Sequence, residues 1–345
     1  MKIVHTFLPV LYKEIPKHII YLMTASMLLA RRYYEKVVLY TDKKTANIVR
    51  QIGLPYDEIN DTLLDNVKVG TFSIPKLLVY KDQKEPYIHI DLDSFLFKRI
   101  LFNDKKSIYS TFDEGRKLMI NTDHGSLGFY NTYIKYTYEL LDNLPNDFVK
   151  KIDFTEVPNM SIFGGHNYEL IAEATNYCLD IYEKNRNFFD GKFYNACIIE
   201  QLFIPTAIKL LYNKDNYRFN FLYSGIPNSI EFYEENCEYP FIINSSSEII
   251  EFKNEFDLYA NYDYDYNGYL HLCGFKNFDK MLYVLRTIIL LKLDGESYLN
   301  RINKLFVERF AYEKDSKHYE EMKNLLINNP RIKSEVLNSK QKRLI

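Results

Sequence analysis

The stretch YIHIDLD (87–93) joins a short apolar run to two aspartates, and the rest of the chain can be interpreted outward from it. The run has the pattern of a buried strand, so Asp91 and Asp93 come where that strand leaves its sheet. Ligands of open parallel sheets bind beyond the carboxyl ends of the strands, and hard divalent cations prefer carboxylate oxygens. The pair therefore predicts a cation site. The competing interpretation is a surface turn in which Asp91 caps Ser94 or Phe95.

Strand and helix patterns alternate ahead of this stretch. Strands are predicted over residues 2–7 and 36–42, and helices over 16–34, 43–52 and 73–82, with Ser73 as the cap of the last helix. Such alternation predicts a mainly parallel sheet with right-handed crossovers and helices on both faces.

The order becomes mixed after about residue 100. Strands are predicted over 107–112 and 154–165, helices over 129–143, 167–185 and 194–212, short strands between loops over 213–272, and helices from 277 onward. We expect an α/β domain with a Rossmann-like mixed sheet over residues 1–280, followed by a helical extension over 281–345.

The formal net charge of −2 and the pI near 6.4 argue against duplex nucleic acid as a partner, because a surface that binds nucleic acid is normally basic. The longest apolar run, 281–293, is interrupted by Arg286 and is too short to span a bilayer. The N-terminus lacks the apolar region of a signal peptide. We expect a cytoplasmic protein whose basic tail, 329–345, offers a place for peripheral membrane contact.

Three families place an acidic pair like this one after a strand. HIDLDSFLF (89–97) resembles the palm motif of translesion DNA polymerases, but the Ser-x-Asp-Glu motif that should follow one subdomain later is approximated only by TFDEG (111–115). Haloacid-dehalogenase phosphatases have a small residue and then Thr or Val after D-x-D, whereas this chain has Phe95. Neither of these two families fits the chain.

The third family is the nucleotide-diphospho-sugar transferases with the GT-A fold. The N-terminal strand, the strand ending in VVLYTD (37–42) and a D-x-D in the middle of the domain resemble its layout. NMSIFGG (159–165), IIEQLF (198–203) and HLCGFKN (271–277) resemble, in the same order, motifs of its family 8 branch, which includes glycogenin and lipopolysaccharide galactosyltransferases.

This resemblance covers residues 1 to about 280 and has departures. Ser161 stands where the family pattern has Gly, and Leu202 replaces an acidic residue. The last motif is one residue shorter between Gly274 and Lys276 and lacks its final Pro-Trp. Retention of configuration is therefore implied only as far as the family 8 resemblance holds.

The resemblance implies a Mn²⁺ or Mg²⁺ ion that is held by Asp91, Asp93 and His271 and bridges the diphosphate of the donor. The other residues implied to bind the donor are Tyr40, Thr41, Asp42, Lys76, Leu92, Asn159, Gly164, Gly165, Gly274 and Lys276. Judged from the residues alone, Asp42 can instead cap the helix that follows it, Lys76 can be solvated, and His271 can be an ordinary hydrogen-bonded residue. The glycine pair can equally form a turn before the next helix.

Glu200 and Gln201 are the candidates for a place beside the anomeric carbon of the sugar. Glu200 would stabilise an oxocarbenium-like state, or act as the base if the reaction inverts, and Gln201 would orient the acceptor hydroxyl. Asp113 is a second candidate base. The alternative is that Glu200 lies on a helix whose apolar neighbours face the core.

We therefore expect a metal-dependent hexosyltransferase of polysaccharide biosynthesis. It would move a sugar from a nucleotide-diphosphate donor, with UDP favoured, to a glycan or another hydroxyl acceptor. The alternative is a catalytically inactive domain of the same fold that binds a nucleotide-sugar or a glycan as a scaffold. The D-x-D pair, His271 and Lys276 favour the enzyme.

Overall fold

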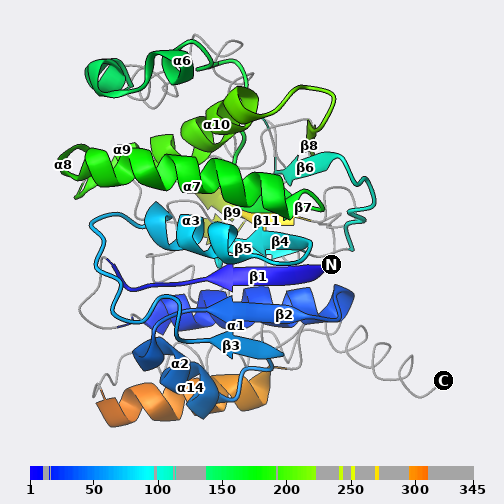
Figure 1. Cartoon of the computed structure of the whole chain (residues 1–345). Helices are drawn as coiled ribbons and strands as arrows, with labels where there is room; N and C mark the ends of the chain where they lie inside the picture. Colours follow the sequence, from blue (N-terminus) through cyan, green and yellow to red (C-terminus); the bar gives the residue numbers. More distant parts are fainter. Residues whose placement is uncertain are drawn as a thin grey trace.

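The computed structural model describes residues 1–10, 15, 17–96, 99–111, 113, 137–191, 193–222, 241–243, 250–252, 269–271 and 295–309. Its centre is a seven-stranded sheet in the order β3-β2-β1-β4-β7-β6-β8 (Figure 1). The strands are β3 (Glu58–Asn60), β2 (Val37–Tyr40), β1 (Lys2–Thr6), β4 (Tyr87–Ile90), β7 (Ile162–Gly165), β6 (Ser107–Ser110) and β8 (Arg218–Phe221). Two smaller sheets pair β5 (Ser94–Leu96) with β11 (Tyr269–His271), and β9 (Phe241–Ile243) with β10 (Ile250–Phe252).

Six of the seven strands run in the same direction. β1 is parallel to β2 and β4, β2 is parallel to β3, and β6 is parallel to β8, whereas β7 is antiparallel to both of its neighbours, β4 and β6. The expected α/β class with a mainly parallel mixed sheet is confirmed. Each of the strands β3 and β5 has three residues, which is too short for periodicity to reveal it.

Helices cover both faces of the sheet (Figure 1). They are α1 (Lys17–Tyr33), α2 (Lys43–Ile52), α3 (Ser73–Asp82), η1 (Leu141–Asn143), α6 (Asn146–Val149), α7 (Tyr168–Lys184), α8 (Arg186–Phe189), α9 (Phe193–Cys197), η2 (Ile198–Phe203), α10 (Ile204–Leu211) and α14 (Glu296–Arg309). One prediction about their ends is wrong. The N-cap residue of α3 is Phe72 rather than Ser73, and its side chain has no oxygen with which to cap the helix.

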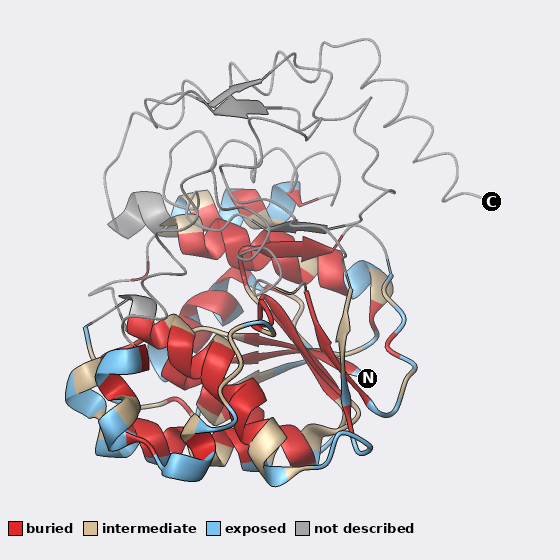
Figure 2. Ribbon diagram, turned by 90° about the horizontal axis from the view of Figure 1, so that it is seen from above, coloured by how far each residue is buried: buried red, intermediate tan, exposed pale blue. Residues whose placement is uncertain are grey.

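Successive residues of each strand face opposite layers of helices. Ile3 and Ile88 belong to the core that packs on α1, α2 and α14, and their neighbours Val4 and Tyr87 belong to the core that packs on α3, α7 and α10. Figure 2 shows the buried strands between the buried inner sides of these helices. Burial on both faces explains why β2, with the sequence VVLY, is a continuous apolar run. None of the described helices combines the length and hydrophobicity that a membrane span requires.

Gly164 and Gly165 are required for packing inside the sheet. β7 passes between β4 and β6, and its two glycines have φ angles of +144° and +156°. A Cβ atom at Gly164 would lie 2.3 Å from the backbone oxygen of Tyr87. We expect Gly164→Ala to lower the free energy of unfolding by about 3 kcal/mol or more, because it combines backbone strain with a clash against backbone.

Gly191 provides the matched control for this prediction. Its φ of +74° is also positive, but no described atom lies within 4 Å of an added Cβ. Gly191→Ala should therefore cost only about 1 kcal/mol, the strain of the backbone alone. Urea denaturation measures both variants, and equal losses would show that the packing of β7 is not the reason for glycine at position 164.

The helix that carries Glu200 and Gln201 is irregular. α9, η2 and α10 follow one another without a break, and η2 is a π-helical segment, a form that often marks functional sites. Pro205 explains the irregularity, because it has no N–H to donate to the Gln201 carbonyl and its ring would clash with that carbonyl in a regular α-helix. Thr206 Oγ1 donates to the Leu202 carbonyl at 2.7 Å. The predicted helix over 194–212 is thus present, with one widened turn at the candidate residues.

Candidate functional site

Most of the candidate residues gather at one edge of the sheet. The carboxyl ends of β1, β2, β4 and β6 lie at this edge, together with the amino end of the antiparallel β7. The segments located there are residues 41–42 after β2, residues 91–93 after β4, Asp113 after β6 and Asn159 before β7. The amino end of α3 lies at the same edge, because the helix runs back along the sheet before β4 begins.

Lys76 lies between two carboxylates at this edge. Its Nζ is 2.8 Å from Asp91 Oδ1 and 2.9 Å from Oδ2, and it donates to Glu200 Oε1 at 3.0 Å. Only 15% of the Lys76 side chain and 5% of the Glu200 side chain are exposed. The interpretation of Lys76 as a solvated residue is therefore wrong. The lysine joins the turn after β4 to the widened turn of η2.

Tyr80 and His89 pack behind this cluster. Tyr80 comes four residues after Lys76 in α3, so both side chains lie on one face of the helix. The Tyr80 hydroxyl donates to Glu200 Oε1 at 3.4 Å and lies 3.4 Å from His89 Nδ1. Neither residue is among the candidates predicted from the sequence. Their spacings, four from Lys76 and two from Asp91, are the signal that could have indicated them.

Burial and charge together set the protonation of the cluster. Burial alone would lower the pKa of Lys76, but the carboxylates of Asp91 and Glu200 outweigh it, and the pKa lies above the ordinary value of a lysine. Burial raises the pKa of Glu200 to about 7, with Asp91 adding to the rise and Lys76 opposing it. Burial also lowers the pKa of His89 well below its usual value, and Lys76 adds to that effect. The cluster therefore holds a charged lysine, a neutral histidine and a glutamate that titrates near neutrality.

Backbone hydrogen bonds fix the turn that follows β4. The Asp91 N–H donates to the Ser161 carbonyl at 2.8 Å, and the Ser94 N–H donates to the Asp91 carbonyl at 3.0 Å. Asp93 is buried. β5 then pairs with β11 in a register that puts His271 opposite Ser94, the residue next to Asp93. Because Lys76 engages the Asp91 carboxylate, this segment is more than a surface turn.

Asn159 and Ser161 shape the entry to β7. Asn159 Oδ1 accepts hydrogen bonds from the Ser161 N–H at 3.0 Å and from Ser161 Oγ at 2.6 Å. The Ser161 hydroxyl lies 2.7 Å from Thr111 Oγ1, which accepts from the Ile162 N–H at 2.9 Å. Ser161, which departs from the family pattern, thus ties β7 to the segment that follows β6.

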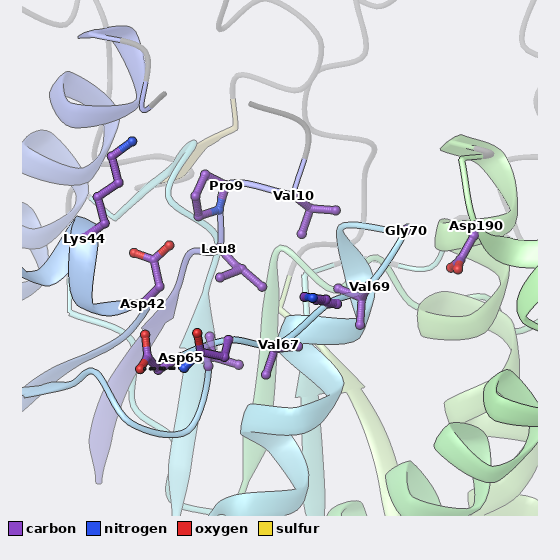
Figure 3. Close-up of a pocket in the computed structure, with 13 residues that line it drawn as sticks. Leu8, Pro9, Val10, Asp42, Lys44, Asp65, Val67, Val69, Gly70 and Asp190 are labelled. Atoms are coloured by element: carbon purple, nitrogen blue, oxygen red, sulfur yellow. Dashed lines mark hydrogen bonds between the residues drawn. The ribbon is translucent and has the colours of Figure 1, made fainter. Parts of the chain in front are cut away.

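A pocket of about 630 Å³ lies at the same edge of the sheet, beside β1 and β2. In Figure 3, Leu8, Val67 and Val69 lie between Asp42 on one side and Asp190 on the other. The remaining lining residues are Pro9, Val10, Lys44, Leu64, Asp65, Asn66, Lys68 and Gly70. The pocket therefore has an apolar middle and charged ends. Of its lining residues, only Asp42 is predicted from the sequence to bind the donor.

Of the three residues predicted at the end of β2, only Asp42 lines the pocket. Its Oδ1 accepts from the Thr45 N–H at 2.6 Å, so the predicted capping of α2 is confirmed. Tyr40 is buried in the core beside α3, and Thr41 is fully buried. The Tyr40 side chain, predicted to bind the donor, therefore points into the core, because its position in the strand turns it toward the helix layer.

Three further donor candidates are explained by packing within the fold. Leu92 is buried in the core, so its side chain is not part of a binding surface. Gly164 and Gly165 pair with Ile88 and Tyr87, toward the opposite edge of the sheet. The glycine pair, predicted to bind the donor, therefore does not lie at the edge where the carboxylates gather. The close approach of neighbouring strands explains it instead.

The remaining predicted residues have mixed positions. Asp113 is at the site edge, where its Oδ1 accepts from the Val157 N–H at 3.1 Å and holds a loop. Gln201 is half-buried in η2, next to Glu200. Gly274 and Lys276 lie outside the described residues.

The sequence matches a family described as "Family of unknown function (DUF6734)" over residues 11–247. The curated proteins contain no match. Among solved structures, similarity is found to an active-site mutant of LgtC (8% identity, TM-score 0.34) and to the galactosyltransferase LgtC in complex with donor and acceptor sugar analogs (10% identity, TM-score 0.34). Each comparison covers 59% of this chain, and 70% and 71% of the other chain. The glycosyltransferase GlyE of Streptococcus pneumoniae TIGR4 is 12% identical with a TM-score of 0.41, over 92% of this chain and 66% of GlyE.

Proposed function

Because the chain belongs to DUF6734, a family of unknown function, its activity has to be inferred from the site, and we propose that it is a metal-dependent glycosyltransferase with a nucleotide-sugar donor. The observation that carries the proposal is the buried Lys76, which holds Asp91 of the D-x-D turn and Glu200 of η2 together. They meet at the carboxyl edge of a mainly parallel sheet, where such folds bind ligands. A carboxyl group that titrates near neutrality is suited to acid–base work.

The residues after β4 fit a Mn²⁺ or Mg²⁺ ion by the chemistry of their donor atoms. The described residues alone contain no cluster of three suitable side chains, but Asp91 and Asp93 supply two carboxylates, and the backbone of His271 is opposite Ser94. Carboxylate oxygens with one imidazole nitrogen suit Mn²⁺. Asp91, Asp93 and His271 would hold the ion, which supplies positive charge to the departing nucleoside diphosphate.

The pocket beside β1 and β2 suits the nucleoside of a UDP donor. Leu8, Val67 and Val69 offer an apolar surface on which a flat base can pack. Asp42 can accept a hydrogen bond from a ribose hydroxyl through the carboxylate oxygen that does not bond the Thr45 N–H. The pocket and the Lys76 cluster are at the same edge of the sheet, as one extended donor requires.

The cluster would act on the sugar. As a carboxylate, Glu200 stabilises positive charge that develops at the anomeric carbon, or it accepts the proton of the acceptor if the reaction inverts. Lys76 fixes Glu200 relative to Asp91, and Gln201 would orient a glycan or another hydroxyl acceptor. Retention of configuration belongs to the proposal through the family 8 resemblance. A role in polysaccharide synthesis and a cytoplasmic location are further parts of the proposal.

A panel of UDP- and GDP-sugars tests the proposal through metal-dependent hydrolysis of the donor. At least one donor should be hydrolysed with Mn²⁺ present, and Asp93→Asn should weaken UDP affinity in Mn²⁺ about tenfold or more. Asp180→Asn, at an exposed position of α7, is the control and should change nothing. Absence of metal-dependent turnover, together with unchanged UDP affinity in Asp93→Asn, would refute the enzyme. Binding of UDP without any turnover would favour the inactive module.

A further inference from the structure

A network of hydrogen-bonded side chains, formed by Ser26, His5 and Tyr56, reaches the D-x-D turn from the face of the sheet opposite to Lys76. Ser26, in α1, donates through its Oγ to the Ser94 carbonyl at 3.0 Å, and the same Oγ lies 3.3 Å from His5 Nε2. His5, in β1, has its Nδ1 2.9 Å from the Tyr56 hydroxyl. Ser94 directly follows Asp93, so this network ends on the turn that carries both aspartates.

The donors and acceptors of this network can be assigned by elimination. The Ser26 hydroxyl has one hydrogen and gives it to the Ser94 carbonyl, so the contact with His5 requires an N–H on Nε2. His5 Nδ1 is then the acceptor of the Tyr56 O–H. His5 is fully buried and burial lowers its pKa to about 3, in agreement with a neutral ring. Each hydrogen bond of the network therefore has one defined donor and one defined acceptor, and this orients the Ser26 hydroxyl toward the Ser94 carbonyl.

The position of Ser94 makes this contact important for the turn. Its N–H is held by the Asp91 carbonyl, and its own carbonyl is held by Ser26, so both backbone polar groups of the residue are fixed. The contact also joins the helix α1 to the strand β5. These two elements also pack on each other through apolar side chains such as Phe95. Apolar packing sets distance without direction, whereas a hydrogen bond sets both.

We propose that Ser26, oriented by His5, is a positioning residue that fixes the backbone of the D-x-D turn and thereby the directions of Asp91 and Asp93. The consequence for metal binding rests on the proposed function. The consequence for the backbone of the turn does not.

The exchange rate of the Ser94 amide hydrogen tests the backbone directly, without any ligand. Ser26→Ala should speed this exchange about tenfold, the effect of losing one hydrogen bond. His5→Phe keeps a ring of similar shape and should speed the same exchange by a smaller factor, because Ser26 then loses only its orientation. Thr24→Val is the matched control, since Thr24 is a buried hydroxyl of the same helix that donates to the Ile20 carbonyl at 2.7 Å. It should leave the Ser94 amide unchanged.

Calorimetric titration with Mn²⁺ alone, on the same proteins, then reads the consequence for the aspartates. Ser26→Ala should bind Mn²⁺ about tenfold more weakly than the wild type, and Thr24→Val should bind equally well. Unchanged Ser94 exchange in Ser26→Ala would overturn the inference whatever the metal does. Faster exchange with unchanged Mn²⁺ affinity would overturn the positioning role. Faster exchange in a protein whose wild type binds no Mn²⁺ would refute the proposed function and leave the anchored turn standing.

Discussion

Lys76→Met should lower donor turnover about a hundredfold or more and destabilise the fold by about 3 kcal/mol. Methionine keeps the length and apolar stem of lysine, so the change removes the ammonium and little else. Without it, Glu200 is buried beside Asp91 with no opposing charge, and the link between the D-x-D turn and η2 is lost. Donor hydrolysis and urea denaturation measure the two effects separately.

Lys209→Met provides the control for the loss of stability. Lys209 is also largely buried, with 12% of its side chain exposed, and its Nζ lies 3.1 Å from Asp153 and 2.9 Å from Glu156. This variant should also be destabilised, by a smaller amount because Asp153 and Glu156 are 40% and 31% exposed, and should keep its turnover per folded molecule. If both lysine variants lost turnover equally, Lys76 would act through stability alone, and its place in the site would have to be abandoned.

The edge where the candidates meet could be predicted because it follows from local patterns. Mostly apolar runs mark β2 and β4, and the polar residues that follow them, including Asp42 and Asp91, fall at the carboxyl edge of any parallel sheet. The cap formed by Asp42 is also local, since the Thr45 N–H that it accepts is three residues away. Both results depend only on short-range geometry.

The contacts that give the site its chemistry could not be predicted, because they join distant segments. Lys76 and Glu200 are 124 residues apart, and periodicity alone does not show that a lysine in the first turns of α3 points between two carboxylates. Glycine in a strand pattern predicts either a turn or a close backbone approach. At Gly164 the second applies, and only the pairing of β7 with β4 decides it.

Glu200→Gln should lower turnover by about 10³-fold while the fold persists. Glutamine has the same shape and still accepts the Lys76 and Tyr80 hydrogen bonds, but it carries no charge and cannot accept a proton. Glu156→Gln, next to Lys209, is the control and should keep full turnover. Turnover in Glu200→Gln within a factor of about two of the wild type would exclude Glu200 from the reaction.

The pH dependence of the same variant separates the charge of Glu200 from its packing. The carboxyl titrates near 4.5 in the unfolded chain and near 7 in the folded one, where burial raises its pKa, so folding favours the protonated form. The stability that this form contributes is fully present below pH 4.5 and is lost as the pH rises through 7. Between about pH 5 and about pH 8 the wild type should lose roughly 2.5 kcal/mol relative to Glu200→Gln.

Turnover should follow the opposite slope, because the ionised carboxylate is the reactive form. In the wild type it should rise through about pH 7, while the residual turnover of Glu200→Gln should lack this rise. Urea denaturation and donor hydrolysis, measured over the same pH range, give both curves. As the pH rises, the free energy of unfolding should therefore fall while turnover increases. Both changes have one cause, because the ionised Glu200 is the reactive form and its burial destabilises the fold. If wild-type stability did not change relative to the variant, Glu200 would already be ionised without cost, and its titration could not explain the pH dependence of the reaction.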